Sequence, residues 1–197
     1  MELILASQSP YRRAQLEHFG MRFRAVKPEV DEDALKARGP TDLGALTVFL
    51  ATAKAQSLRA RFPNDVLLGS DQIAELHGQR LDKPLTRERA ALQLDRLQGD
   101  QHSLITSLAL LVPGHEPWTA SEFTVVKMRP LSADDINAYL DVDQPLDCAG
   151  SYKIEKAGLS LIERVSGHDP SAIQGLPLIL LTEGLKARGL TVRQFWR

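Results

Sequence analysis

Short apolar runs alternate with longer amphipathic stretches along most of this 197-residue chain. Leu3 to Ala6 and Val66 to Leu68 are continuous apolar runs with the length of buried strands. Between Thr41 and Arg61, apolar side chains recur at helical spacing on one face. This alternation predicts an α/β or mixed α+β domain, in which helices pack against a sheet.

Turn and capping residues place the other elements. Ser9, as an N-cap before Pro10, predicts a helix that ends at Gly20. The pair Ser132 and Asp135 predicts a capping box at the start of another helix. The remaining expectations are strands at 21–26, 103–112, 122–128 and 159–165, helices at 86–97 and 177–188, and an acidic loop at 28–33.

Charge and length narrow the functions that the chain can have. It carries 24 Lys and Arg against 25 Asp and Glu, so no overall field draws it to nucleic acid or to an anionic membrane. The apolar run before Ser7 is too short for a signal peptide or a membrane-spanning helix. We therefore expect a cytoplasmic protein with one domain over residues 1–197, in which a smaller lobe at about 100–165 is an option.

Several familiar kinds of site are absent from the sequence. Cys148 is the only cysteine, which excludes an intramolecular disulfide and a thiolate zinc site within the chain. An inert, buried thiol is favoured over a reactive one, because no histidine is near it in sequence. The histidines lack metal-binding spacing, and no P-loop, dinucleotide-binding glycine motif or nucleophile elbow occurs.

Two adjacent arginines at a predicted helix start are the first candidate site. The first turn of a helix favours anions, so the positive charges of Arg12 and Arg13 are unfavourable there. A bound polyanion such as a phosphate chain would offset that repulsion, and Ser7 and Ser9 would add hydroxyl donors. The alternative is a solvated helix end whose arginines pair with nearby acids.

Carboxylates form the second candidate site. The segment from Glu29 to Asp33, which includes Glu32, holds four acids in five residues, and hard divalent cations prefer such oxygen ligands. Asp71 interrupts an apolar strand, where a carboxylate is costly unless it is paired, metal-bound or catalytic. Burial would make it a stronger base toward water. The alternatives are an exposed acidic loop without a function and an aspartate exposed where its strand ends.

Two lysines carry little signal by themselves. Lys54 lies on the polar side of its predicted helix, and Lys83 precedes Pro84 in a predicted loop. Most lysines are solvated, so solvent exposure is the first expectation for each.

Seven stretches of the sequence are informative when they are taken together. They are LILASQSPYRR, PEVDE, ATAKAQSL, LLGSDQ, LDKPLT, CAGSYKIE and GLPLI. Their order and spacing, from the first strand to the last helix, resemble those of the Maf family of nucleotide pyrophosphatases. Their combination is far more specific than any one of them.

The resemblance implies both a fold and an activity. The fold would be an elongated central mixed sheet flanked by helices, similar to the inosine triphosphatases (Maf/Ham1). The activity would be hydrolysis of a nucleoside triphosphate to the monophosphate and pyrophosphate, aided by a divalent cation such as Mg²⁺, Mn²⁺ or Co²⁺. The partner would be a small nucleotide, and a homodimer is left open.

The resemblance also assigns roles by position. Asp71 aligns with the proton acceptor, and Glu32 with the acidic residue near the metal, to which Asp71 is a second candidate ligand. Five residues match positions that hold phosphates. They are Ser7, Arg12, Arg13, Lys54 and Lys83.

Three residues point to one branch of the family, the YceF branch of 7-methyl-GTP pyrophosphatases. Tyr11, Gln72 and Glu155 occupy positions where the dTTP/UTP branch usually has Arg, Thr and Gln. Methylated guanine is a cation, so an aromatic face and a carboxylate both favour it. Two departures are Tyr11, where this branch would have Trp, and Asp82, where Gly is commoner.

Three alternatives to this assignment stay open. One is a pyrophosphatase for dTTP or UTP. Another is a non-catalytic nucleotide-binding regulator of septum formation. The third concerns Glu155 alone, which would then be only a turn residue before Gly158.

Overall fold

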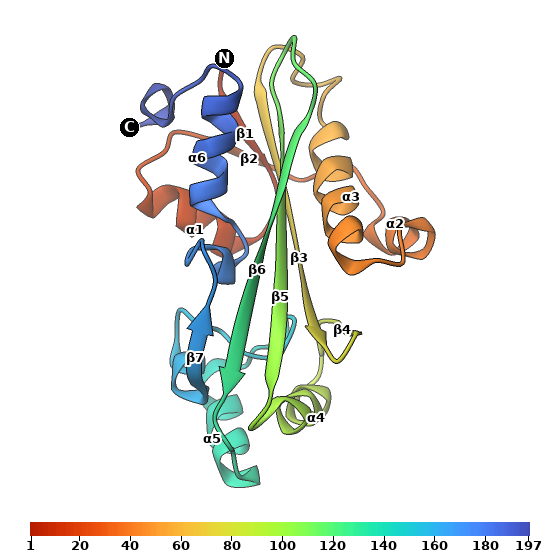
Figure 1. The fold of residues 1–197 in the computed structure, drawn as a ribbon, viewed down its shortest axis with the longest axis vertical. Coiled ribbons are helices and arrows are strands. Elements are labelled where there is room, and N and C mark those ends of the chain that lie inside the picture. Colours follow the sequence, from red (N-terminus) through yellow and green to blue (C-terminus); the bar gives the residue numbers. More distant parts are fainter. The chain divides into compact units, whose positions relative to one another are not determined.

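The computed structural model describes residues 1–197 and contains one seven-stranded mixed sheet together with six α-helices (Figure 1). The strand order is β2-β1-β3-β5-β6-β7, with β4 paired to β3 outside this path. The predicted mixed α/β class is confirmed. None of the helices combines the length and the apolar character needed to cross a membrane.

The structure gives the following bounds for the elements. The strands are β1 (Leu3–Ala6), β2 (Arg24–Val26), β3 (Val66–Leu76), β4 (Gln79–Leu81), β5 (Gln101–Leu111), β6 (Trp118–Met128) and β7 (Ile162–Ser166). The helices are α1 (Pro10–His18), α2 (Glu32–Arg38), α3 (Leu43–Gln56), α4 (Arg87–Leu97), α5 (Ala133–Asp143) and α6 (Leu178–Ala187), with short 3-10 turns η1 (Ala157–Leu161), η2 (Ala172–Gln174) and η3 (Val192–Phe195).

The chain forms two compact units. Unit 1 consists of Met1–Gln72, Thr106–Glu122 and Asp169–Arg197. Unit 2 consists of Ile73–Ile105 and Phe123–His168. The expectation of one domain with a smaller lobe at about 100–165 stays a prediction.

Unit 1 is a three-layer structure because its strands are apolar on both faces. Leu3 and Leu5 of β1 pack in one cluster with α1 and α6. Ile4 and Ala6 point the other way and pack with α3. Successive side chains of a strand face opposite sides, so a run of four apolar residues needs a helix layer on each side. Figure 1 shows α1 and α6 on one side of β1 and α3 on the other.

Most of the predicted element boundaries agree with the structure. Ser9 caps α1 through a bond from the backbone N–H of Arg12, and Thr86 caps α4. The capping box of Ser132 and Asp135 at α5 is present. Gly189 follows the last helix with a φ of 71°, a left-handed conformation that suits glycine.

Three local predictions were wrong. The acidic loop contains the start of α2, because Asp31 caps this helix by accepting from the backbone N–H groups of Asp33 and Ala34. The strand expected from residue 159 begins at Ile162, after the 3-10 turn η1. The strand expected at Val66 to Leu68 is longer than predicted, since β3 continues through the polar residues Gly69 to Gln72 to Leu76.

Unit 2 contains a buried polar pair that the sequence pattern does not predict. The His102 ring nitrogen Nε2 lies 2.8 Å from the hydroxyl of Tyr152, and both side chains are buried. Burial lowers the pKa of His102 from 6.5 to about 4, with Asp100 acting in the opposite direction. Burial also raises the pKa of Tyr152. The native state therefore keeps the histidine neutral over a range in which the unfolded chain binds a proton.

We expect the stability of the protein to decrease as the pH falls from 6.5 toward 4. In that window the unfolded state takes up a proton at His102 and the folded state does not, so the stabilisation present above 6.5 is lost. The loss should be about 3 kcal/mol at most. Urea unfolding of the parent and of His102→Gln at about pH 7.5 and about pH 4.5 isolates this effect. An identical pH dependence of the two proteins would contradict it.

Candidate active site

The site lies where β1 ends beside a strand that continues. β1 and β3 are parallel, with Leu5 opposite Leu68. The chain leaves the sheet at Ser7, whereas β3 runs on through Asp71. Ligands of open α/β sheets bind at the carboxyl ends of parallel strands. The fold of unit 1 therefore places Ser7 and Asp71 at the edge of the sheet where ligands bind.

Gly69 allows α3 to approach β3 closely. A Cβ atom at this position would lie 2.0 Å from the carbonyl oxygen of Ala51 in α3, so no larger residue fits without moving the helix. One turn farther along α3, Lys54 reaches the strand two residues after Gly69. The close approach of helix and strand thus brings Lys54 to Asp71.

Lys54 lies between two carboxylates. Its Nζ is 2.6 Å from an oxygen of Asp71 and 3.1 Å from an oxygen of Glu32. Lys54 is 5% exposed and Asp71 is 6% exposed, whereas the Glu32 side chain is 45% exposed. The expectation of a solvated lysine was wrong, and the alternative of an aspartate exposed at a strand end is excluded, because the contact of α3 with β3 buries both groups as a pair.

Arg12 is the second cation of this site. Its Nε donates to the carbonyl oxygen of Gly175 at 2.7 Å, and its Nη1 lies 3.4 Å from the hydroxyl of Ser7. Burial lowers the pKa of Arg12, and the negative charges of Asp71 and Glu32 raise it. Two cations, two carboxylates and one hydroxyl therefore gather in unit 1, and this charge pattern suits a phosphate chain with its counter-ion.

The other residues of the predicted helix end behave differently. Arg13 is exposed, and its Nε lies 2.9 Å from an oxygen of Glu17 on the surface of α1. This is the surface pairing considered as an alternative, and its role toward phosphate stays a prediction. Tyr11 is half-buried in the first turn of α1.

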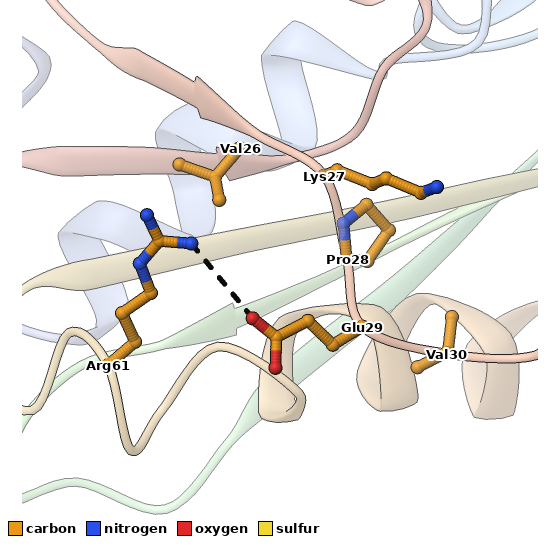
Figure 2. A pocket seen from close by; sticks show the side chains of 6 residues that line it. All are labelled: Val26, Lys27, Pro28, Glu29, Val30 and Arg61. Atoms are coloured by element: carbon orange, nitrogen blue, oxygen red, sulfur yellow. Dashed lines mark ion pairs between the residues drawn. The ribbon is translucent and has the colours of Figure 1, made fainter.

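The four clustered acids have different surroundings. Glu29 lies 3.9 Å from Arg61, at an open pocket of about 540 Å³ (Figure 2). This pocket is lined by Val26, Lys27, Pro28, Glu29, Val30 and Arg61, and so by none of the residues that gather around Lys54. Of the four acids, only Glu32 is placed at the candidate site.

The two carboxylates suit a divalent cation as ligands. Oxygens of Asp71 and Glu32 both lie within 3.1 Å of one cationic atom, the Nζ of Lys54, so they already converge on a positive charge. No group of three or more His, Cys, Asp or Glu side chains forms a metal site. Mg²⁺ commonly takes one or two protein carboxylates and completes its shell with phosphate and water. The donor set fits that arrangement.

Gln72 has partners of its own within unit 1. The side-chain nitrogen of Gln72 donates to the hydroxyl of Thr106 at 2.8 Å and to the carbonyl of Ala172 at 3.0 Å. Lys83 and Glu155 are exposed residues of unit 2. Their roles, and the alternative of Glu155 as a turn residue, stay predictions.

Sequence reasoning gave no role to the segment between β7 and α6, although GLPLI, at its end, is one of the stretches that resemble the Maf family. Gly175 contacts Arg12, and Asp169, although 1% exposed, is a carboxylate that accepts several backbone hydrogen bonds. The stretch Asp169-Pro170-Ser171 before an apolar helix has the composition of a helix cap, which could have drawn attention to it.

Comparisons with known proteins identify the family of the chain. A family model described as Maf-like protein matches residues 2–188. Relatives named 7-methyl-GTP pyrophosphatase from Xanthomonas axonopodis pv. citri (strain 306) and Xanthomonas campestris pv. campestris (strain 8004) are 43% and 40% identical. The alignments cover 96% of this chain and 98% and 97% of those proteins.

A solved structure supports the fold independently. The Staphylococcus aureus Ham1 protein matches with a TM-score of 0.50 and 16% sequence identity, over 93% of this chain and 100% of that one. This likeness concerns the fold alone. The family model and the two relatives confirm the resemblance found in the sequence. The chain belongs to the Maf family.

Proposed function

We propose that this chain is a metal-dependent nucleoside triphosphate pyrophosphatase that converts 7-methyl-GTP to 7-methyl-GMP and pyrophosphate. The observation that carries the proposal is the buried Lys54, paired with Asp71 and Glu32 beside Arg12. An exposed surface cluster would not bury charges in this way. The names of the relatives from Xanthomonas supply the substrate.

Asp71 is the proposed general base. Its second carboxylate oxygen can accept a proton from an attacking water while the first stays bonded to Lys54. A positioned base contributes roughly 10²- to 10⁴-fold to the rate. The bond to Lys54 fixes the orientation of the carboxylate, which a base needs in order to meet its water at hydrogen-bond distance.

Lys54, Arg12 and Ser7 would bind the triphosphate. Negative charge moves onto the leaving pyrophosphate during the reaction, and preorganised cations stabilise it without having to reorient. Lys83 and Arg13 are further proposed contacts, from their match to the family pattern. A divalent cation held by Asp71 and Glu32 would neutralise phosphate charge further.

Recognition of the methylated base would fall to Tyr11 and Glu155. An aromatic face and a carboxylate both attract a cationic ring, and the carboxylate can also accept from the N1–H and amino edge. The amide nitrogen of Gln72 is engaged within unit 1, so any direct contact of Gln72 with the base would use its carbonyl oxygen. A neutral pyrimidine would gain less from these groups.

A panel of nucleotides tests the proposal. We expect kcat/KM for 7-methyl-GTP to exceed the values for GTP, dTTP and UTP by at least about tenfold, which corresponds to about 1.4 kcal/mol of selective binding. Pyrophosphate release would be measured with Mg²⁺, Mn²⁺ and Co²⁺, and with a chelator as the control.

Each other outcome of the panel has a distinct meaning. A preference for dTTP or UTP would contradict the substrate and leave the reaction type in place. Nucleotide binding without pyrophosphate release under any of the three metals would favour the regulator of septum formation. Full activity in the presence of the chelator would contradict the dependence on a metal.

A further inference from the structure

The segment from Asp169 to Leu176 is held rigidly in front of α6. Asp169 accepts hydrogen bonds from the backbone N–H groups of Ser171 at 3.0 Å and of Ile179 at 2.7 Å. The residue at the N-cap of α6 is Pro177, which makes no side-chain cap bond. The buried carboxylate of Asp169 therefore acts as the helix cap and ties the start of the segment to the first turn of α6.

Two glutamines fix the rest of the segment. The side-chain nitrogen of Gln15 in α1 donates to the carbonyl oxygens of Ser171 at 2.7 Å and Leu176 at 3.2 Å. Gln72 of β3 donates to the carbonyl of Ala172. Because separate elements bind its backbone, the segment has little freedom to move relative to them.

This segment presents one carbonyl group to the candidate active site. The carbonyl oxygen of Gly175 accepts from the Nε of Arg12 at 2.7 Å, and the hydroxyl of Ser70 lies 2.9 Å from the same oxygen. Gly175 has a φ of 98°, a left-handed conformation that strains other residues. A Cβ atom there would lie 3.4 Å from the Nε of Arg12, at van der Waals distance, so a side chain at this position would touch the group that makes the bond.

A hydrogen bond at Nε fixes the plane of a guanidinium group. The group is flat and has five N–H donors, of which four are on the two terminal nitrogens. With Nε held by Gly175, those terminal nitrogens keep a defined direction, and a ligand that binds them does not have to order a flexible side chain.

We propose that Gly175 is a positioning residue for Arg12. The carbonyl oxygen of Gly175 orients the guanidinium group of Arg12 toward the phosphates. Asp169 and Gln15 hold Gly175 in place for this purpose. The inference rests on the proposed function, because it takes Arg12 to be a phosphate-binding residue. Gly175 itself would touch no substrate.

A double-mutant cycle with Gly175→Ala and Arg12→Lys tests this inference. Lysine ends in a single ammonium group. It lacks a separate Nε–H that could bind Gly175 while a planar pair of terminal nitrogens binds phosphate, so the same bond cannot orient it. We expect Gly175→Ala to raise the KM for 7-methyl-GTP about tenfold, and kcat to change less, since the loss is one of preorganised binding. In the Arg12→Lys background the same change should alter KM less than about twofold.

Binding of inorganic tripolyphosphate, measured by calorimetry, gives a second readout that needs no turnover. Gly175→Ala should weaken this binding by a similar factor in the parent and not in Arg12→Lys. Gly189→Ala is the matched control, because Gly189 also has a positive φ of 71° but a Cβ atom there would meet nothing within 4 Å. The Gly189→Ala variant has the same kind of backbone strain without a contact to Arg12, so its KM should equal that of the parent.

The outcomes separate this inference from the proposed function. Equal effects of Gly175→Ala in both backgrounds, or a parent protein that binds no tripolyphosphate, would overturn the inference. Coupled binding without any hydrolysis of nucleotides would overturn the proposed function and support the inference. If Gly175→Ala does not fold, Gln15→Met removes two bonds to the segment without touching the Arg12 contact, and the same cycle applies with the same expected outcomes.

Discussion

Replacing Asp71 by Asn should reduce the hydrolysis of 7-methyl-GTP by a factor of about 10³ or more while the protein stays folded. An amide cannot accept a proton from water at neutral pH, so the base is lost. The side-chain carbonyl can still accept the hydrogen bond from Lys54, which keeps the buried lysine partnered. The loss should therefore appear in kcat much more than in KM.

The measurement is steady-state pyrophosphate release together with urea unfolding. Weakening a buried hydrogen bond to a charged group costs about 1 to 3 kcal/mol, which a native protein of this size tolerates. Asp33→Asn is the control, because Asp33 is an exposed acid in the first turn of α2 and should leave the rate within about twofold of the parent. Activity of Asp71→Asn within a few-fold of the parent would exclude Asp71 as the base.

Local signals in the sequence predict most of the elements. Runs such as Leu3 to Ala6 are apolar on both faces. The side chains of Ser9 and Ser132 cap helices, because each accepts a hydrogen bond from the backbone N–H three residues later. These interactions depend on neighbours in the chain. The start of α2 escapes this reasoning because the acidic residues around Asp31 resemble a set of ligands, although Asp31 serves as the helix cap.

The environment of Lys54 could not be predicted from the helix pattern. A lysine on a polar helix face is normally solvated, and it is buried here because Gly69 lets the backbone of α3 lie directly on β3. That contact joins residues distant in sequence. Only the resemblance to a family, which assigned Lys54 to phosphate binding, pointed to it in advance.

The contact between Arg12 and Gly175 shows the same limit more clearly. A carbonyl group has no side-chain identity, so no pattern of residue types reveals that the backbone at Gly175 orients an arginine 163 positions away. The acids present the opposite difficulty, since Glu29 and Glu32 look alike in the sequence. The fold separates them, as Glu29 faces Arg61 and Glu32 faces Lys54.

Replacing Lys54 by Met should lower kcat/KM for 7-methyl-GTP by a factor of about 10² to 10³ and should also destabilise the protein. Methionine has a similar length but no charge, so the triphosphate loses a preorganised cation. In the free protein the carboxylate of Asp71 stays buried without its partner at 2.6 Å. Removal of one member of a buried ion pair costs about 3 to 5 kcal/mol, and Glu32, being half-exposed, should contribute little of this.

The dependence on salt concentration distinguishes the loss of stability in Lys54→Met from the loss of a surface ion pair. Exposed pairs are screened at high ionic strength, whereas a pair as buried as Lys54 and Asp71 is screened much less. The difference in unfolding free energy between parent and Lys54→Met should therefore stay nearly constant from about 0.05 M to about 0.5 M NaCl. Lys186→Met, at an exposed position in the last turn of α6, is the control and should change neither rate nor stability appreciably. If Lys54→Met kept full activity, or if salt abolished its effect on stability, the buried lysine would not be the centre of the site.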